Sequence, residues 1–340
     1  IYVFNTGTEN DPALNLAFNY LSYLGTDKMT AEEIASEMYD IACSFYMNAG
    51  ANQSSIQITG LSENMGKAME IVEGLIAGAK PDEAILENLK GDMLKSRADA
   101  KLNQSRCFGA LQRYLFYGGD FIRRTTLTDP ALQALTSEQL LAKIGDLTGK
   151  QHEVLYYGPQ KETEIKSALA EHHKVAADLQ PLEKKFSALL PTDANKVVLA
   201  QYDAKQLYYL QFSNRGEKFD VAADPEITLY NEYFGGGMNT IVFQEMREAR
   251  GLAYSAWATL ATPSNANGDY SYYAFIATQN DKMQKAIEAF DEIINNMPES
   301  EKAFSIAKEA LISRLRTERT VKDGVLSVSY THLTLPTIRL

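Results

Sequence analysis

Apolar and polar positions along the first half of the chain alternate between the period of a helix and the period of a strand. Apolar residues recur at helical spacing over 13–24, and Gly25 follows as a stop signal. Thr30 and Glu33 have the spacing of a capping box and predict a second helix. Further helices are predicted over 65–76, from Pro81 to about Tyr117, and after the Thr136/Gln139 capping box, with strands at 43–48, 54–59 and 153–157.

The second half repeats this order. Strands are predicted at 197–201, 207–213, 253–261 and 269–278, and helices at 225–234, 239–249 and about 283–297. Three blocks recur in the same order in both halves: Tyr23-Leu24-Gly25 with Tyr233-Phe234-Gly235, 37–39 with 245–247, and 65–70 with 283–288. Recurrence in order predicts an internal duplication. The fold class expected from these patterns is α+β, in two duplicated repeats.

The boundaries follow from breaks in these patterns. Residues 176–195 contain two prolines and no sustained period, which is typical of a linker. The first repeat is therefore expected at 1–175 and the second at 196–327. The chain opens at Ile1 instead of Met, so we expect the true start, and with it a first strand, to be missing.

The last residues form a separate case. Residues 328–337 resemble one reading frame of a transposase-type sequencing adapter, so we exclude 328–340 from fold reasoning. The natural sequence is then expected to stop near Ser327, and His332 is not native. A genuine terminal strand is the alternative, and the source DNA would distinguish the two.

Composition and charge argue against several classes of function. A formal net charge of −11 argues against nucleic-acid binding and against docking on anionic lipid, which both depend on clustered Lys and Arg. No apolar run approaches the roughly 18 residues of a membrane span. Cys43 and Cys107 are expected to be buried, inert thiols. His152 is expected to be an ordinary residue beside a strand, and the His172–His173 pair a solvated helix end.

One run carries a specific resemblance. Residues 234–254 combine the glycine run 235–237, a helix containing Arg247-Glu248, and Gly251-Leu252-Ala253-Tyr254. This run resembles the second-repeat signature of the M16 (pitrilysin/insulinase) zinc metallopeptidases, and the resemblance covers nearly all of the chain up to about residue 326. It implies α+β repeats that each have an antiparallel sheet with helices packed on one face, and two such repeats would form one half of a peptidase chamber. The glycine run lacks the Gly-Lys-Ser/Thr ending of a phosphate loop, so a tight turn and a close helix approach explain it.

The family's catalytic residues are absent from the matching helix. The family holds zinc with His-x-x-Glu-His on the first helix of its catalytic repeat, where the glutamate activates water. In this sequence those three positions are Leu16, Asn19 and Tyr20. We therefore expect no catalytic residue and no metal in this chain, with zinc bound by a missing N-terminal half.

Two other positions do match. Arg247 and Tyr254 correspond to the Arg/Tyr pair by which the family is implied to contact substrate at the zinc site. A guanidinium offers fixed donors to a peptide carbonyl, and a phenol can donate to an oxygen that gains charge. A surface ion pair at Arg247 and a packed strand tyrosine at Tyr254 are the alternatives. Tyr39 and Tyr46 hold the same two places in the first repeat, so the fold itself does not require the pair.

The resulting hypothesis is a substrate-binding, non-catalytic C-terminal half of an M16-type zinc endopeptidase that acts on peptides or small unfolded polypeptides. The alternative is an inactive structural or partner subunit of an M16-like complex. The expected partners are a catalytic N-terminal half, on the same chain or another, and a peptide substrate. The compartment stays open, with a soluble bacterial protein of the periplasm or cytoplasm expected.

Overall fold

The computed structural model describes residues 1–183, 185–263 and 268–319, and the chain divides into two compact units. Unit 1 comprises Ile1–Asn103 and Tyr117–Ser187, and unit 2 comprises Gln104–Phe116 and the chain from Ala188 onward. The expected boundaries at 175 and 195 remain predictions. The adapter-like tail 328–340 and residues 264–267 lie outside the described residues.

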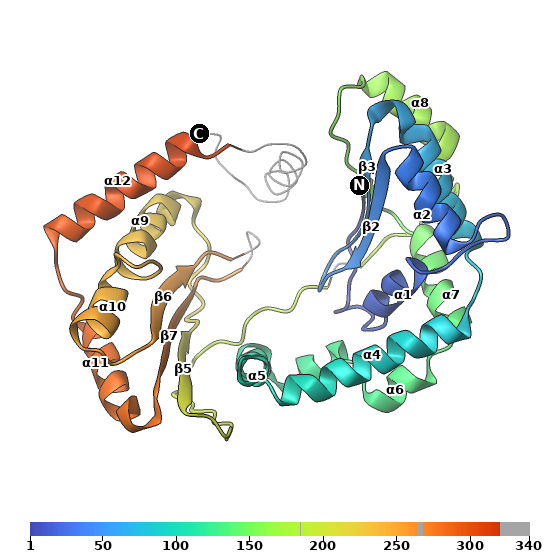
Figure 1. Cartoon of the computed structure of the whole chain (residues 1–340). Helices are drawn as coiled ribbons and strands as arrows, with labels where there is room; N and C mark the ends of the chain where they lie inside the picture. The colour runs from blue at the N-terminus through green and yellow to red at the C-terminus, as the bar shows by residue number, and fades with distance from the viewer. Residues whose placement is uncertain (184, 264–267, 320–340) are drawn as a thin grey trace. The chain divides into compact units, whose positions relative to one another are not determined.

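Unit 1 is built on a four-stranded antiparallel sheet of order β2-β3-β1-β4. Figure 1 shows β2 and β3 of this sheet with helices of the same unit beside them. Its strands are β1 (Tyr2–Phe4), β2 (Cys43–Ala49), β3 (Ser54–Gly60) and β4 (Glu153–Val154). Its helices are α1 (Leu14–Leu21), α2 (Ala31–Asp40), α3 (Met65–Gly78), α4 (Glu83–Lys101), α6 (Asp129–Ala134), α7 (Ser137–Thr148) and α8 (Glu162–His172), with a short turn, η1 (Ser62–Asn64), before α3. β1 begins at the second residue of the given sequence. The expectation of a further, missing first strand stays a prediction.

Local signals explain where these helices begin. The Thr30 hydroxyl accepts a hydrogen bond from the Glu33 N–H at 3.2 Å, and the Glu33 carboxylate accepts one from the Thr30 N–H at 2.7 Å. Thr136 and Gln139 make the same reciprocal pair at the start of α7. Both predicted capping boxes are therefore confirmed. Each satisfies N–H groups that a helix N-terminus otherwise leaves unpaired.

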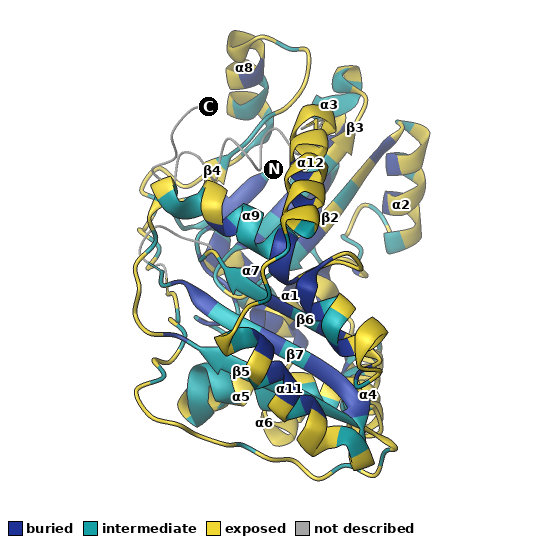
Figure 2. Cartoon of the chain, turned by 90° about the vertical axis from the view of Figure 1, so that its left-hand side faces the viewer, coloured by how far each residue is buried: buried dark blue, intermediate teal, exposed yellow. Residues whose placement is uncertain are grey.

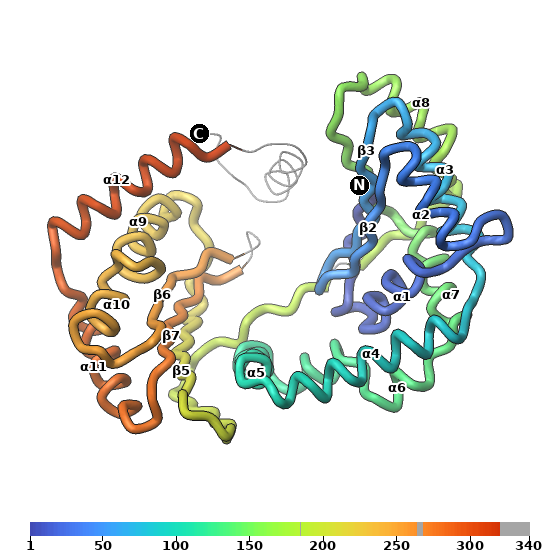
Figure 3. Tube along the Cα trace, in the orientation of Figure 1, coloured from blue at the N-terminus to red at the C-terminus, as the bar shows by residue number. Residues whose placement is uncertain are grey.

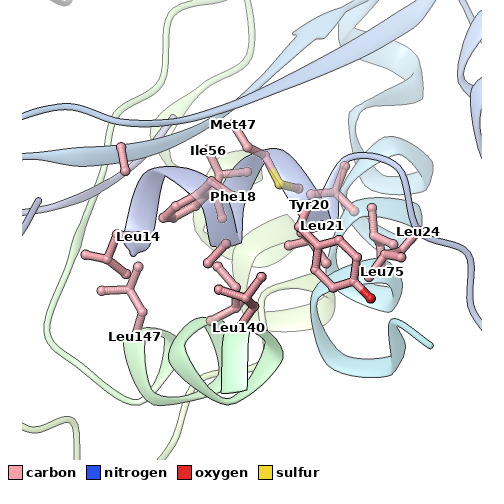
Figure 4. Close-up of a cluster of buried hydrophobic side chains, with 14 of the residues drawn as sticks. Leu14, Phe18, Tyr20, Leu21, Leu24, Met47, Ile56, Leu75, Leu140 and Leu147 are labelled. Carbon is pink, nitrogen blue, oxygen red and sulfur yellow. The ribbon is translucent and has the colours of Figure 1, made fainter. Parts of the chain in front are cut away.

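The core of unit 1 lies between the sheet and α1. Figure 4 shows Leu14, Phe18 and Leu21 of α1 between strand residues on one side and α7 on the other. Phe18 and Leu21 are fully buried, as the helical spacing over 13–24 predicts. Figure 2 shows the same division between buried inner faces and the exposed outer face of α2.

Unit 2 has a three-stranded antiparallel sheet of order β5-β7-β6. Its strands are β5 (Gln206–Ser213), β6 (Ser255–Ala261) and β7 (Ser271–Gln279), and its helical segments are η2 (Val221–Ala223), α9 (Asp224–Phe234), α10 (Ile241–Phe243), η3 (Gln244–Ala249), η4 (Asn280–Lys282), α11 (Met283–Asn295) and α12 (Glu301–Thr317). The order β1-β3-β2 of unit 1 recurs here as β5-β7-β6, with helices between corresponding strands. The predicted α+β fold of duplicated repeats is confirmed.

α5 (Gln104–Thr125) belongs to both units. Its first part packs on the sheet face of unit 2, where Phe108 lies 5.5 Å from Tyr208 and Phe116 lies 4.6 Å from Phe212, centroid to centroid. Gly118, with φ of 78°, interrupts the helix just after this part. The periodicity predicts one long helix after Pro81, whereas the structure has α4 and an interrupted α5.

One other expectation is wrong. Residues 197–201 form no strand, and Val197 and Leu199 are 83% and 87% exposed. An alternating run becomes a strand only beside a partner, and none of the described strands pairs with it. Apart from residue 184, the chain between α8 and β5 contains neither helix nor strand (Figure 3).

Candidate functional site

The helix at the family's zinc positions has become part of the core. Leu16 and Tyr20 are buried at 2% and 0% exposure, and Asn19 is exposed. The Tyr20 hydroxyl donates to Ser137 Oγ at 2.7 Å and accepts from the Asp82 N–H at 2.7 Å. The two positions that would carry imidazoles thus pack inward, where one side chain is aliphatic and the other is fully hydrogen-bonded.

These residues do not fit a zinc ion. Leucine has no donor atom, and an asparagine amide does not accept a proton as a catalytic carboxylate does. Across the described residues, no group of three or more His, Cys, Asp or Glu side chains could hold a metal. Cys43 is buried and Cys107 is half-buried, so the expectation of two buried thiols is met at Cys43 only.

Arg247 lies on η3, which the sequence predicts as ordinary helix. The structure has a π-helical turn there, marked by the Arg250 N–H donating to the Glu245 carbonyl at 3.2 Å. Single π-turns inside helices are rare overall, and those that do occur are often found at functional sites. The Arg247 guanidinium lies 5.0 Å from the Phe243 ring centroid and 3.7 Å from a Glu248 oxygen, and its side chain is 50% exposed. Arg247 is therefore held against a ring while its donors remain accessible.

The neighbouring arginine behaves differently. Arg250 lies 2.8 Å from Glu292 and 3.5 Å from Glu245. Its hydrogen bond and charge lower the pKa of the Glu292 carboxyl. Arg250 thus contacts two carboxylates, whereas Arg247 contacts the single carboxylate of Glu248 at 3.7 Å, as the surface ion-pair alternative expects, and its side chain is more exposed.

Tyr254 directly precedes β6. Its N–H donates to the Ala277 carbonyl at 2.8 Å, which fixes its backbone on β7. Its phenol oxygen accepts a hydrogen bond from Gln279 Nε2 at 2.7 Å, and the residue is 52% exposed. The phenol hydrogen is not used in this hydrogen bond, because the Tyr254 oxygen is the acceptor. The packed-tyrosine alternative does not describe this side chain.

The segment between Arg247 and Tyr254 is short and ordered. Gly251 takes a φ of 58°, and the N–H groups of Leu252 and Ala253 both donate to the Met246 carbonyl. No hydrogen bond or ring contact joins the Arg247 and Tyr254 side chains in the described part of the chain. They are two separate exposed groups at the ends of one rigid loop.

The glycine run behaves as predicted at its first residue. A Cβ on Gly235 would lie 1.7 Å from the Ala258 carbonyl oxygen, so only glycine allows α9 to end this close to β6. The helix predicted over 239–249 begins two residues later, at Ile241, and Thr240 is its N-cap residue.

Sequence reasoning missed two features of unit 1. Tyr39 and Tyr46, which correspond to Arg247 and Tyr254, are 82% and 64% exposed. The interpretation of His173 as solvated is wrong, because its side chain is 12% exposed and contacts Glu73 and His152. Neither partner is near it in sequence, so local pattern contains no signal for this cluster.

Comparisons with known proteins identify the fold and the family. Residues 147–311 match the model of the Peptidase M16 inactive domain. These residues belong to the M16 inactive-domain family. The M16 resemblance of the sequence is confirmed, and the match supports a protease-like domain of the non-catalytic type over these residues.

M16 relatives at low identity extend over more of the chain. An uncharacterized zinc protease of Streptomyces coelicolor is 22% identical over 269 residues, which cover 74% of this chain and 56% of that protein. An uncharacterized zinc protease of Rickettsia felis is 24% identical over 87% of this chain and 71% of that protein. The chain thus spans just over half the length of the Streptomyces protein.

Solved structures share the fold of the M16 inactive domain. The peptidase M16 inactive domain from Pseudomonas fluorescens matches with a TM-score of 0.70 and 18% identity, over 97% of this chain and 80% of that one. The periplasmic protease PqqL from Escherichia coli matches with a TM-score of 0.77 and 13% identity, over 98% of this chain and 38% of that one. None of the helices in the described residues is long and apolar enough to cross a membrane.

Proposed function

We propose that this chain is the substrate-binding half of an M16-type zinc endopeptidase that acts on peptides or small unfolded polypeptides. The observation that carries the proposal is the exposed pair Arg247 and Tyr254, which is held on an ordered loop of the inactive domain. Exposed arginine and tyrosine side chains carry polar groups that can form hydrogen bonds with a peptide backbone.

The chemistry of each side chain suits a peptide. A guanidinium presents several N–H donors in fixed directions, so Arg247 is suited to bind a peptide carbonyl. Tyr254 accepts a hydrogen bond from Gln279, which leaves its own hydrogen to donate to a substrate oxygen. A donor placed where negative charge develops stabilises the tetrahedral state of peptide hydrolysis.

The zinc of such an enzyme belongs to another part of the assembly. Leu16, Asn19 and Tyr20 do not fit the metal, so no step of the reaction is assigned to them. The expected partner is a catalytic half with its own zinc helix, on the same chain or on a second one. The names of the relatives as zinc proteases support this arrangement.

Peptide binding by the chain itself tests the proposal. A fluorescent unfolded peptide is titrated with the chain, and its anisotropy gives the Kd. Arg247→Ala should weaken binding by roughly tenfold or more, the effect of losing about 1.5–3 kcal/mol of charged hydrogen bonding. Arg316→Ala, which removes an exposed arginine at the end of α12, is the matched control and should leave the Kd unchanged.

Two results would contradict the proposal. One is no saturable peptide binding by the wild-type chain, which would favour the inactive structural or partner subunit. The other is an equal loss in Arg247→Ala and Arg316→Ala, which would reduce the effect to general charge. Tyr254→Phe keeps the aromatic ring and removes only the hydroxyl, so its Kd measures the contribution of the hydroxyl to peptide binding.

A further inference from the structure

Unit 1 contains a second cluster of chemically active side chains that the proposed function does not use. His152 lies just before β4, His173 caps the end of α8, and Glu73 comes from α3. The two imidazoles face each other, with His152 Nε2 2.8 Å from His173 Nε2. Three segments that are distant in sequence thus meet at one pair of ring nitrogens.

The outer nitrogen of each ring is already engaged. His152 Nδ1 lies 2.8 Å from the Lys150 carbonyl oxygen, which only accepts hydrogen bonds, so Nδ1 carries the hydrogen. His173 Nδ1 lies 2.5 Å from Glu73 Oε1. With both Nδ1 atoms donating outward, the neutral rings present two lone pairs toward each other. Two facing lone pairs repel each other, so the pair needs a cation between them, which is either a shared proton or, with the rings slightly further apart, a metal ion.

Packing holds both rings in this orientation. The Tyr2 ring stacks on His173 at 4.4 Å between centroids, and the Phe4 ring lies 4.9 Å from His152. The two imidazoles are nearly perpendicular, at 84°. The positions of the Nε2 atoms are therefore set by the core of the sheet before any ligand arrives.

This arrangement matches the way proteins prepare histidines for a metal. Histidine ligands almost always donate their other N–H to a carboxylate or a backbone carbonyl, which fixes the tautomer and the ring direction. Here one histidine has the carboxylate of Glu73 and the other has the carbonyl of Lys150. Imidazole nitrogen suits Zn²⁺, Cu²⁺ and Ni²⁺.

We propose that His152 and His173 form a two-histidine site for a divalent transition metal, with Glu73 as the outer partner of His173. At metal–nitrogen distances of about 2.0–2.1 Å and a tetrahedral angle, the two Nε2 atoms would lie about 3.3 Å apart. The rings must therefore separate by about 0.5 Å from the 2.8 Å that suits a shared proton. Because no third protein ligand lies in the described cluster, water completes the coordination, and the metal is exchangeable.

The consequence is a cross-link within unit 1. The metal would join the end of α8 to the start of β4, and through Glu73 to α3. This site is independent of the peptide-binding loop in unit 2, so either proposal can fail without the other.

The test is a calorimetric titration of the full chain, purified without a histidine tag, with Zn²⁺ as the probe. One saturable site is expected, and His152→Ala or His173→Ala should abolish it. Glu73→Gln should weaken it by roughly tenfold or more. His172→Ala is the matched control, because the His172 ring packs over Gly66 of α3 and takes no part in the Nε2 pair. His332→Ala is the second control, for a histidine outside the described residues.

A measurement on the unaltered chain covers the case in which a variant fails to fold. Imidazole resonances of His152 and His173 should shift together on Zn²⁺ addition, whereas those of His172 stay in place. Absence of a saturable site, binding that survives His173→Ala, or binding lost in His172→Ala or His332→Ala would overturn the proposal.

Discussion

Replacing Gly235 with alanine puts a methyl group where unit 2 has no room for one. The Cβ would lie 1.7 Å from the Ala258 carbonyl oxygen and 2.6 Å from its carbon. Both atoms are backbone, so no side chain can rotate away. Gly235 also accepts a hydrogen bond from the Ala258 N–H at 2.9 Å, and moving the end of α9 off β6 would break it.

The magnitude follows from these contacts. Overpacking of this kind costs about 1–3 kcal/mol, and the lost hydrogen bond adds about 1 kcal/mol. Phe234, buried at 1% exposure beside Gly235, would shift with the helix end. Alanine offsets about 0.5 kcal/mol of this by restricting the unfolded chain. The expected net loss for unit 2 is about 1.5–3.5 kcal/mol.

Trp257 provides the assay. It is the only tryptophan of the chain, and it stacks on Phe275 within the sheet of unit 2. Its fluorescence during urea unfolding therefore reports on this unit. The control is Gly236→Ala, where the nearest atom to the added Cβ is the Asn231 carbonyl oxygen at 4.0 Å. An unchanged midpoint in Gly235→Ala, or an equal loss in Gly236→Ala, would refute the close-approach argument.

Two further variants test the packing, one in unit 1 and one in unit 2. Tyr20→Phe should destabilise unit 1 by about 1–3 kcal/mol in urea unfolding followed by circular dichroism, because Ser137 and Asp82 lose their hydroxyl partner. Tyr23→Phe, at an exposed position, should change little, and equal effects would contradict the role of the Tyr20 hydrogen bonds. Phe108→Ala should speed limited proteolysis within 104–116, because the ring contacts to Tyr208 and Phe275 hold this segment on unit 2. Leu102→Ala, a substitution at an exposed position, is the control for Phe108→Ala. Identical cleavage rates in the two variants would argue against the role of the Phe108 ring contacts.

The candidate site could be located from sequence but not described by it. The run 234–254 is a local signature, so Arg247 and Tyr254 could be named from residue types and spacing alone. Their exposure could not, because it depends on Phe243, the π-helical turn and Gln279. A turn that differs from an α-helix by one hydrogen-bond register leaves no mark in apolar periodicity.

The sequence alone determined the local features, which depend on residues only a few positions apart. The capping boxes, the amphipathic α1 and the strand pair β2–β3 all follow from such short-range patterns. The order of blocks along the chain also determined the duplicated fold, because each block specifies one element.

Only the tertiary structure decided which distant segments would meet. It placed the first part of α5 on the sheet of unit 2, left 197–201 without a strand, and brought Glu73, His152 and His173 together. It also turned Leu16 and Tyr20 into core residues. The physical reason is the same in each case: a strand needs a partner and a buried polar group needs a hydrogen bond, and both are supplied by residues far away in the chain.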